Sequence, residues 1–291
     1  MKKLKLIGLV MLPALAVALS SSAQKFSLNN LDTGELLSAG KDLVKAAKPM
    51  SDDEEIQLGR RVAARIAGTF GIWKDENWTE RINVMGRTLA LYSERPDLKY
   101  RFAILDTDDV NAYSAPGGYI FISRGMLKEV KSEGELAGVL AHELGHVAKK
   151  HVVKEIQKSN LWSAGAKIAV SASDLNAQEE SLLNGLTDEA WKSLVVKGLS
   201  KEDEFEADRL AALNADKFGY DPYGIYNFIK RLAPEENKPG QNLKMLLGTH
   251  PKPSARLAEL DKLYQKQGCP AGALPDFPER HDKFCAKHPV K

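Results

Sequence analysis

Apolar residues recur at helical spacing over most of the chain and at strand spacing in one short region. Ser51 and Glu54 form the S-x-x-E pattern of a helix N-terminus ahead of an apolar repeat of three and four positions. A second helix is expected over residues 78–92. Residues 100–105 and 118–123 are rich in aromatic and β-branched side chains and are flanked by turn-forming residues. They are predicted to be two strands of one small sheet.

The second half of the chain is predicted to be almost entirely helical. Ser132 and Glu135 form another S-x-x-E pattern, which opens a helix expected to run through His151. Helical spacing continues to residue 267, and the Ala- and Ser-rich stretch 160–176 is the candidate for a lid. No repeat of fixed period is present, which argues against a helical-repeat domain. The predicted fold is therefore α+β and mostly helical, with a small sheet flanked by helices.

The first residues have the pattern of a signal peptide. Three lysines precede an apolar run over residues 6–19, and small residues follow it, so cleavage is expected after Ala23. The run is shorter than the roughly 20 residues that span a bilayer, although an uncleaved anchor remains the alternative. No cysteine lies near this point to carry a lipid. A periplasmic location without stable membrane insertion is expected.

The remaining chain is expected to divide into three parts. Residues 24–50 form a polar N-terminal arm, residues 51–267 form the main domain, and residues 268–291 form a C-terminal tail. The chain has 41 basic and 39 acidic residues, and removing the three lysines of the signal leaves the charge nearly balanced. Because the sequence lacks a basic stripe, a nucleic-acid partner is not expected.

The two cysteines, Cys269 and Cys285, both lie near the C-terminus. In an exported protein an oxidising compartment would allow them to form a disulfide. The alternative is two free thiols. Zinc binding by this pair is disfavoured because neither a CxxC motif nor a Cys-His spacing accompanies them.

The sequence HELGH at residues 142–146 is an HExxH motif inside a predicted helix. At about 100° per residue, His142 and His146 leave the same face about 40° apart, so both imidazoles can share a metal ion. Glu143 projects about 100° away, where it is poorly placed as a ligand but can reach a water on the metal. Leucines and a valine on the other side form an apolar stripe that anchors the helix. The pattern indicates a catalytic zinc site with Glu143 as the general base.

His151 does not complete this site by spacing. The motif HExxHxxGxxH requires glycine at position 149 and histidine at position 152, which are occupied by Lys149 and Val152. On a continuing helix, His151 would lie about 180° from His142, on the apolar side. We therefore expect a core or helix-end histidine.

The acidic segment at residues 201–208 offers carboxylates for a third ligand. On a helix, Glu204 and Asp208 share one face, whereas Glu206 points about 200° away from Glu204. Glu204 could then bind the metal with Asp208 behind it. From these residues alone, a solvated acidic helix start, stabilised by the helix dipole, is the better explanation.

Four motifs in order resemble one family of enzymes. They are NAYSAPGGYIFISRG (111–125), HELGHVAKKH (142–151), EFEAD (204–208) and HPKPSAR (250–256). Together they resemble the HtpX-like and CAAX-prenyl-protease-like zinc metallopeptidases, which are gluzincins with a mini-gluzincin, zincin-like fold. No apolar segment long enough to span a membrane surrounds the motifs, so the chain is similar to the soluble periplasmic branch, without the tetratricopeptide domain of some relatives.

The resemblance implies a role for each matching residue. It makes Glu204 the third ligand of one Zn²⁺ per chain and places Asp208 behind the first histidine. The strand after the Pro-Gly-Gly turn would line the substrate cleft, and its residues are Gly118, Tyr119, Ile120 and Phe121.

His250 and Arg256 match a histidine and an arginine beside the active site of soluble relatives. His250 would either block the metal's open position or donate to the oxyanion. Arg256 would stabilise the tetrahedral intermediate or orient a nearby carboxylate.

The implied function is that of an exported zinc-dependent endopeptidase that hydrolyses peptide bonds in unfolded or damaged envelope proteins, using a zinc-bound water activated by Glu143. The rival interpretation is a zinc-binding envelope protein with chaperone or adaptor behaviour. The sequence leaves the oligomeric state open.

Overall fold

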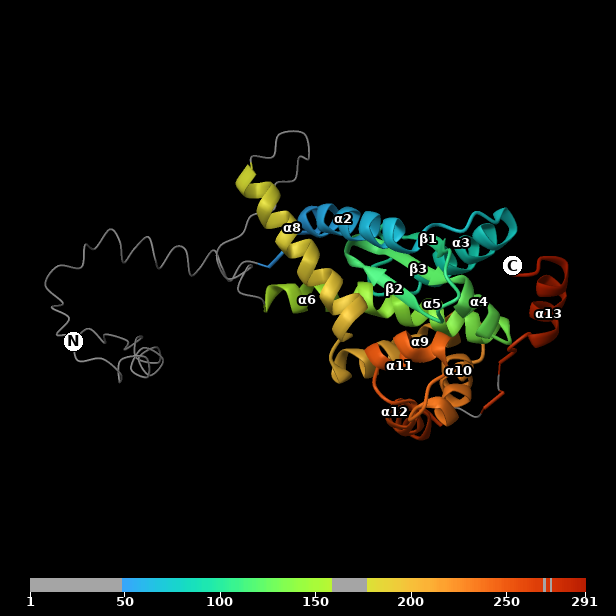
Figure 1. Cartoon of the computed structure of the whole chain (residues 1–291). Helices are drawn as coiled ribbons and strands as arrows, with labels where there is room; N and C mark the ends of the chain where they lie inside the picture. The colour runs from blue at the N-terminus through green and yellow to red at the C-terminus, as the bar shows by residue number, and fades with distance from the viewer. Residues whose placement is uncertain (1–48, 159–176, 269–270, 273) are drawn as a thin grey trace, which may run out of the picture. The chain divides into compact units, whose positions relative to one another are not determined.

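A three-stranded sheet lies within a mostly helical fold (Figure 1). The computed structural model describes residues 49–158, 177–268, 271–272 and 274–291. The strands are β1 (Arg101–Leu105), β2 (Ala112–Ala115) and β3 (Tyr119–Ser123), in the order β1-β3-β2. β1 runs parallel to β3, and β2 runs antiparallel to it. Both predicted strands are confirmed, and β2 was missed because AYSA is short and follows turn-forming residues.

A tight turn joins β2 to β3. This turn is the 3-10 segment η2 (Pro116–Gly118), in which Gly117 has φ 71° and Gly118 has φ 90°. A Cβ atom on Gly117 would lie 2.8 Å from the Cα atom of Ile56, so glycine lets the first helix pack directly on the turn. The buried carboxylate of Glu55 accepts a hydrogen bond of 2.9 Å from the Gly117 amide.

The two predicted N-terminal helices are confirmed. α2 (Asp52–Phe70) begins at Ser51, whose capping box with Glu54 is complete. α3 (Glu76–Ala90) begins two residues earlier than predicted because Asp75 caps it. The other helices of the described chain are α4 (Arg124–Glu129), α5 (Glu133–Ala148), α6 (His151–Gln157), α8 (Ala177–Trp191), α9 (Lys201–Phe218), α10 (Gly224–Leu232), α11 (Lys244–Thr249), α12 (Pro253–Gln267) and α13 (Pro278–Lys287), with the short segments η3 (Lys192–Lys197), η4 (Ala233–Glu235) and η5 (Gln241–Leu243).

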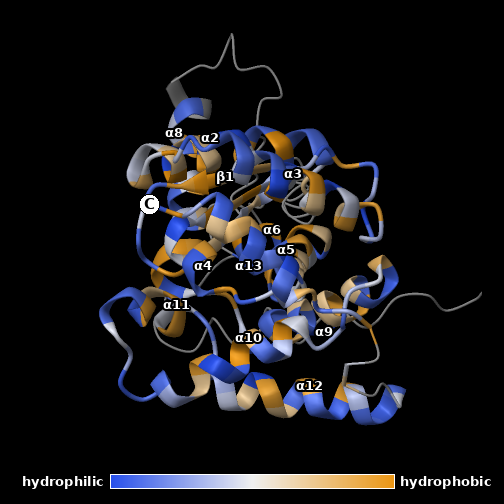
Figure 2. Cartoon of the chain, turned by 90° about the vertical axis from the view of Figure 1, so that its right-hand side faces the viewer, coloured by the Kyte–Doolittle hydropathy of each residue, from blue (hydrophilic) through white to orange (hydrophobic). Residues whose placement is uncertain are grey.

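Both faces of the sheet are buried. Ile120 and Ile122 of β3 pack into a cluster with residues of α3, α5, α9 and α10, whereas Phe121 packs into a second cluster with α2, α6 and α8. Helices α9, α10 and α12 lie on the side of α5 away from the sheet (Figure 1). Figure 2 shows hydrophilic and hydrophobic bands alternating along α12, as expected for a helix with one buried side. Helix α5 is therefore enclosed between the sheet and the C-terminal helices.

The long central helix is shorter than predicted. α5 ends at Ala148, and α6 starts at His151 after Lys150 adopts a left-handed conformation with φ 56°. The Lys150 ammonium lies 2.7 Å from Asp52 and 3.0 Å from Glu55, both in α2. These ion pairs across the fold offset the local cost of a left-handed lysine. The prediction of one helix through His151 was wrong because its end depends on this distant contact.

The C-terminal residues pack on the fold. The ring of Phe284 in α13 meets Trp78 edge to face with centroids 4.9 Å apart, and the Trp78 indole donates a 2.8 Å hydrogen bond to the carbonyl of His288. Arg280 pairs with the buried Glu133 at the start of α5. Residues 278–288 are therefore attached to α3 and α5 by side-chain contacts.

Three predicted segments lie outside the described residues. They are the signal peptide, nearly all of the N-terminal arm, and the candidate lid at 160–176. Met50, at the end of the predicted arm, is buried against the α2 side of the sheet. Among the described residues, no helix combines the length and apolar character needed to cross a bilayer.

Cys285 is half-buried in α13 and has no disulfide partner among the described residues, and Cys269 lies outside them. We expect the two to be oxidised to each other in protein recovered from an oxidising compartment. Closing a loop of this length would stabilise the fold by about 3 kcal/mol in the chain-entropy model. The check is thiol labelling without prior reduction, and labelling of both cysteines would contradict the pairing.

Candidate metal centre

Helix α5 carries the HExxH motif through the middle of the fold. The leucines and valine of the predicted stripe are buried as expected; they are Leu136, Leu140, Leu144 and Val147. The opposite side of α5 is buried too, which an amphipathic helix would not require. Glycines make this possible: a Cβ atom on Gly138 would lie 2.5 Å from the amide nitrogen of Ile225 in α10, and one on Gly145 would lie 3.3 Å from Ala207 in α9.

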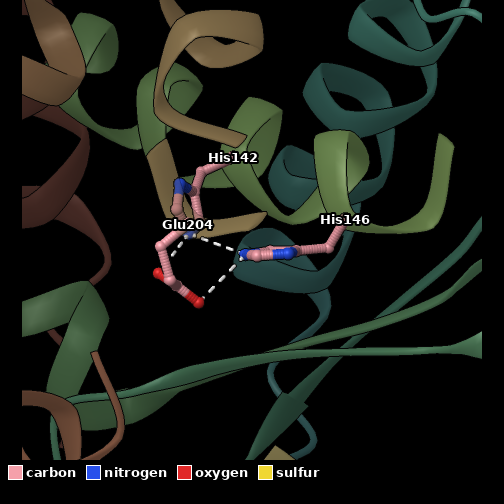
Figure 3. Close-up of side chains that lie close together, drawn as sticks. All are labelled: His142, His146 and Glu204. Atoms are coloured by element: carbon pink, nitrogen blue, oxygen red, sulfur yellow. Dashed lines mark hydrogen bonds and ion pairs between the residues drawn. The ribbon is translucent and has the colours of Figure 1, made fainter. Parts of the chain in front are cut away.

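Two imidazoles and one carboxylate point toward one another at the centre (Figure 3). The Nε2 atoms of His142 and His146 are 3.0 Å apart. Each of these atoms lies 3.5 Å from a carboxylate oxygen of Glu204, which α9 brings against α5. All three residues are at most 3% exposed. Residues from two helices 58 or more positions apart in the sequence thus form one compact donor set.

The donor set fits a tetrahedral zinc ion. Bonds of roughly 2.1 Å at tetrahedral angles would separate neighbouring ligand atoms by about 3.4 Å, close to the separations observed. The Oε2 atom of Glu204 is buried and has no hydrogen-bond partner among the described residues. Two histidines and one glutamate are also the ligands of one class of catalytic zinc site, which keeps its fourth position for water or substrate.

The charges around the site also favour a divalent cation. Glu143, Glu204 and Asp208 are all buried, and Arg256 is the buried cation beside them in the described chain. Burial alone would raise the pKa of Glu204, but the nearby histidines hold it well below its usual range. Burial likewise opposes ionisation of Asp208, but Arg256 lowers its pKa to about 2. A 2+ ion would balance the excess negative charge.

Asp208 and Arg256 form a support behind His142. The Oδ1 atom of Asp208 lies 2.9 Å from Nδ1 of His142, on the side of the ring away from the donor set. Arg256 donates from Nε and Nη2 to the two oxygens of the same carboxylate, at 2.8 and 2.6 Å. Arg256 therefore orients the Asp208 carboxylate through two of its three nitrogens. Orienting a carboxylate is one of the two roles expected for Arg256.

Glu143 is buried beside the donor set. Burial raises the pKa of its carboxyl to about 6, although the charge of His142 and a hydrogen bond with Ser114 of β2 act in the opposite direction. A raised pKa moves a carboxyl toward the range in which it can both accept and release a proton.

The sheet presents β2, and not β3, to this site. β3 is the central strand and pairs with β1 on one side and β2 on the other, so it offers no free backbone edge. The expectation that Gly118, Tyr119, Ile120 and Phe121 form the substrate strand fails for this reason. Ala112, Tyr113 and Ser114 of β2 line a small cavity that also contains Glu143, His146 and Glu204. β2 pairs with β3 on one side and has no second strand partner among the described residues.

His250 lies beside the donor set without belonging to it. Its Nε2 atom is 3.6 Å from Oε2 of Glu204, and the group of three whose ligand atoms lie within 4.8 Å of one another does not include it. Its Nδ1 atom lies 3.0 Å from the carbonyl oxygen of Leu246 and 3.1 Å from the hydroxyl of Thr249. A proton on Nδ1 that is donated to Leu246 leaves Nε2 as a lone pair directed toward the site.

His151 and Glu206 have contacts that the sequence did not indicate. His151 is fully buried, as expected of a core histidine, but its Nδ1 atom lies 2.8 Å from Nδ1 of His146. Glu206 does not reach the donor set and instead contacts His151 and Lys149. The signal that would have revealed this contact is the helix break at Lys150, which local sequence rules do not predict.

Comparison with known proteins gives consistent matches. The model of the family described as "Peptidase family M48" matches residues 76–264. The "Beta-barrel assembly-enhancing protease" of Yersinia pestis is 25% identical over 80% of this chain and 48% of its own length, so the chain spans about half of that relative. The "Metalloprotease YcaL" of Escherichia coli K12 is 27% identical over 89% of this chain and 96% of its own length. The "Mitochondrial metalloendopeptidase OMA1" of Schizosaccharomyces pombe is 29% identical over 62% of this chain and 50% of its own length.

Proposed function

This chain belongs to peptidase family M48. We propose that it is a zinc metalloendopeptidase in which His142, His146 and Glu204 hold one Zn²⁺ and Glu143 is the general base. The convergence of these three buried side chains, with Glu143 next to His142 on the same helix, is the observation that carries the proposal. Three protein ligands leave one position for the reaction, as in catalytic rather than structural zinc sites.

The chain's residues would divide the work of peptide hydrolysis. A zinc ion, when bound, supplies a Lewis acid that acidifies water and polarises the peptide carbonyl. Glu143 accepts a proton from the water whose oxygen attacks the carbonyl carbon. It then delivers that proton to the amine nitrogen as the carbon–nitrogen bond breaks. Asp208, held by Arg256, keeps the ring of His142 oriented with Nε2 toward the metal.

The substrate is proposed to lie extended along the outer edge of β2. Backbone pairing of this kind accepts many side chains and requires a chain segment free of its own structure. We therefore propose unfolded or damaged envelope proteins as substrates of a periplasmic enzyme. The signal-like N-terminus and the similarity to beta-barrel assembly-enhancing proteases support this assignment.

Substrate class is tested with one protein in two states. A disulfide-bonded test protein should be cleaved after reduction and alkylation and should resist cleavage in its native form. Equal cleavage rates for the two forms would contradict the proposal that the enzyme selects unfolded segments.

Asp208→Asn is expected to weaken zinc binding by about 10- to 100-fold, because an amide accepts more weakly and cannot pair with Arg256 as a charge. The measurement is zinc affinity by competition with a chelator. Asp216→Asn, an exposed change in the same helix, serves as the control. Equal affinity of Asp208→Asn and wild type would exclude the supporting role.

His250→Ala is expected to raise basal proteolysis, including self-cleavage. With its Nδ1 proton directed to Leu246, His250 presents a lone pair that can occupy the metal's fourth position but cannot donate to an oxyanion. Removing it would free that position for water. A fall in kcat of about 10²- to 10³-fold would instead indicate an oxyanion donor. Rates of peptide hydrolysis and of self-cleavage, both equal to wild type, would leave neither role standing.

A further inference from the structure

We infer that His151 is a positioning residue for the metal centre, because it accepts a hydrogen bond from Nδ1 of His146 and donates from its own Nε2 to Asp203 and Glu206. This inference rests on the proposed zinc site. It assigns to His146 a support of a different kind from the aspartate behind His142.

The contacts of His151 connect the metal centre to the protein surface. Its Nδ1 atom is 2.8 Å from Nδ1 of His146. On its other side, Nε2 lies 3.1 Å from Glu206 and 3.3 Å from Asp203. The His151 side chain is 0% exposed, whereas those of Asp203 and Glu206 are 16% and 32% exposed. Both ring nitrogens of His151 therefore have a polar partner, and no water needs to reach the ring.

The positions of the ring protons on His146 and His151 follow from the way in which His146 would bind the metal. A ligand nitrogen must carry a lone pair, so a neutral His146 that binds through Nε2 has its proton on Nδ1. The facing Nδ1 atom of His151 must then be the acceptor, since two N–H groups cannot face each other at this distance. A neutral His151 consequently carries its proton on Nε2, where the two carboxylates accept it. The carboxylates thus set the tautomer of His151, and His151 fixes the ring of His146.

A second metal ion on the group His151, Asp203 and Glu206 would fit by distance alone, because their ligand atoms also lie within 4.8 Å of one another. The tautomers argue against it. An ion on Nε2 of a neutral His151 would put the proton on Nδ1, against the proton on Nδ1 of His146. The carboxylates also have other partners: Lys149 lies 3.3 Å from Glu206, and the Ser200 hydroxyl donates a 2.7 Å hydrogen bond to Asp203.

The break between α5 and α6 is what brings His151 into place. On an unbroken helix His151 would project opposite the donor set. The left-handed Lys150 redirects the chain, and its ion pairs with Asp52 and Glu55 tie the turn to α2. The conformation of one residue between two helices therefore determines whether His146 has its partner.

Two substitutions separate this role from packing. In His151→Asn the side-chain oxygen can take the place of Nδ1 and accept from His146, whereas in His151→Gln the longer amide reaches the place of Nε2 and leaves His146 without its acceptor. We expect His151→Gln to lower zinc affinity by about 10- to 100-fold and His151→Asn to stay near wild type. The measurement is chelator competition on the full chain, with thermal unfolding of the metal-free proteins as a control for folding.

The wild-type protein gives a test that requires no substitution. In nitrogen-15 NMR spectra of the zinc-loaded chain, His151 should be the neutral tautomer with its proton on Nε2. A proton on Nδ1, or a second zinc ion that disappears in His151→Asn, would overturn the inference. Equal zinc affinities for wild type and His151→Gln, or equal losses in both variants, would also overturn it. A wild-type chain that binds no zinc would refute the proposed function itself, which is a separate outcome.

Discussion

Glu204→Ala is expected to lose nearly all of its bound zinc. The carboxylate contributes the donor from α9 that faces both histidine Nε2 atoms at 3.5 Å, and alanine leaves a two-histidine site with no third ligand. The loss should exceed the roughly 10- to 100-fold typical of an outer-sphere partner. Elemental analysis of the purified protein, together with chelator competition, measures it.

The control for Glu204→Ala is Glu202→Ala, two residues away in the same helix, where the side chain is exposed. Both changes remove one negative charge from the first turn of α9, so they perturb the helix dipole alike. Glu202→Ala should retain one zinc ion per chain. If the two variants contain the same amount of zinc, the assignment of Glu204 as a ligand is wrong.

Much of the candidate metal centre follows from local spacing. In an α-helix, residues four apart share a face, so HExxH alone predicts that His142 and His146 converge. The same rule places Glu204 and Asp208 together on α9. Spacing does not predict that α5 and α9 pack directly against each other. The resemblance to a family indicated that Glu204 joins the two histidines.

The proposed substrate edge was not predictable in the same way. Residues 112–115 have no alternation of polar and apolar side chains because β2 is buried on both faces. The predicted sheet lacked β2, so the strand after the Pro-Gly-Gly turn had a free edge in that sheet. The antiparallel pairing of Ala112 with Ile122 puts β2 outside it and makes β3 central.

The contact between His151 and His146 was also not predictable from the local sequence. Helical periodicity continues past Ala148, and nothing between residues 148 and 151 is a strong helix breaker. The break arises because Lys150 gains two ion-pair partners in α2, a contact 98 residues away in sequence for Asp52. The local pattern of residues does not predict a contact between residues so far apart in sequence. The sequence therefore did not identify His151 as the partner of His146.

Glu143→Gln is expected to lower the rate of peptide hydrolysis by about 10²- to 10⁴-fold, the range associated with a general acid–base group. Glutamine has nearly the same shape and can accept the same hydrogen bond from Ser114, but it cannot take up a proton. Because Glu143 does not belong to the group of three candidate ligands, zinc content should not change. A protein acting as a chaperone or adaptor through a structural zinc ion would tolerate this change.

The most direct measurement is the rate of casein hydrolysis by wild type and Glu143→Gln, with the zinc content of both proteins determined in the same samples. We predict one zinc ion per chain in each protein and hydrolysis by the wild type alone. Equal hydrolysis by the two proteins at equal zinc content would contradict the assignment of Glu143 as the base and, with it, the proposed reaction.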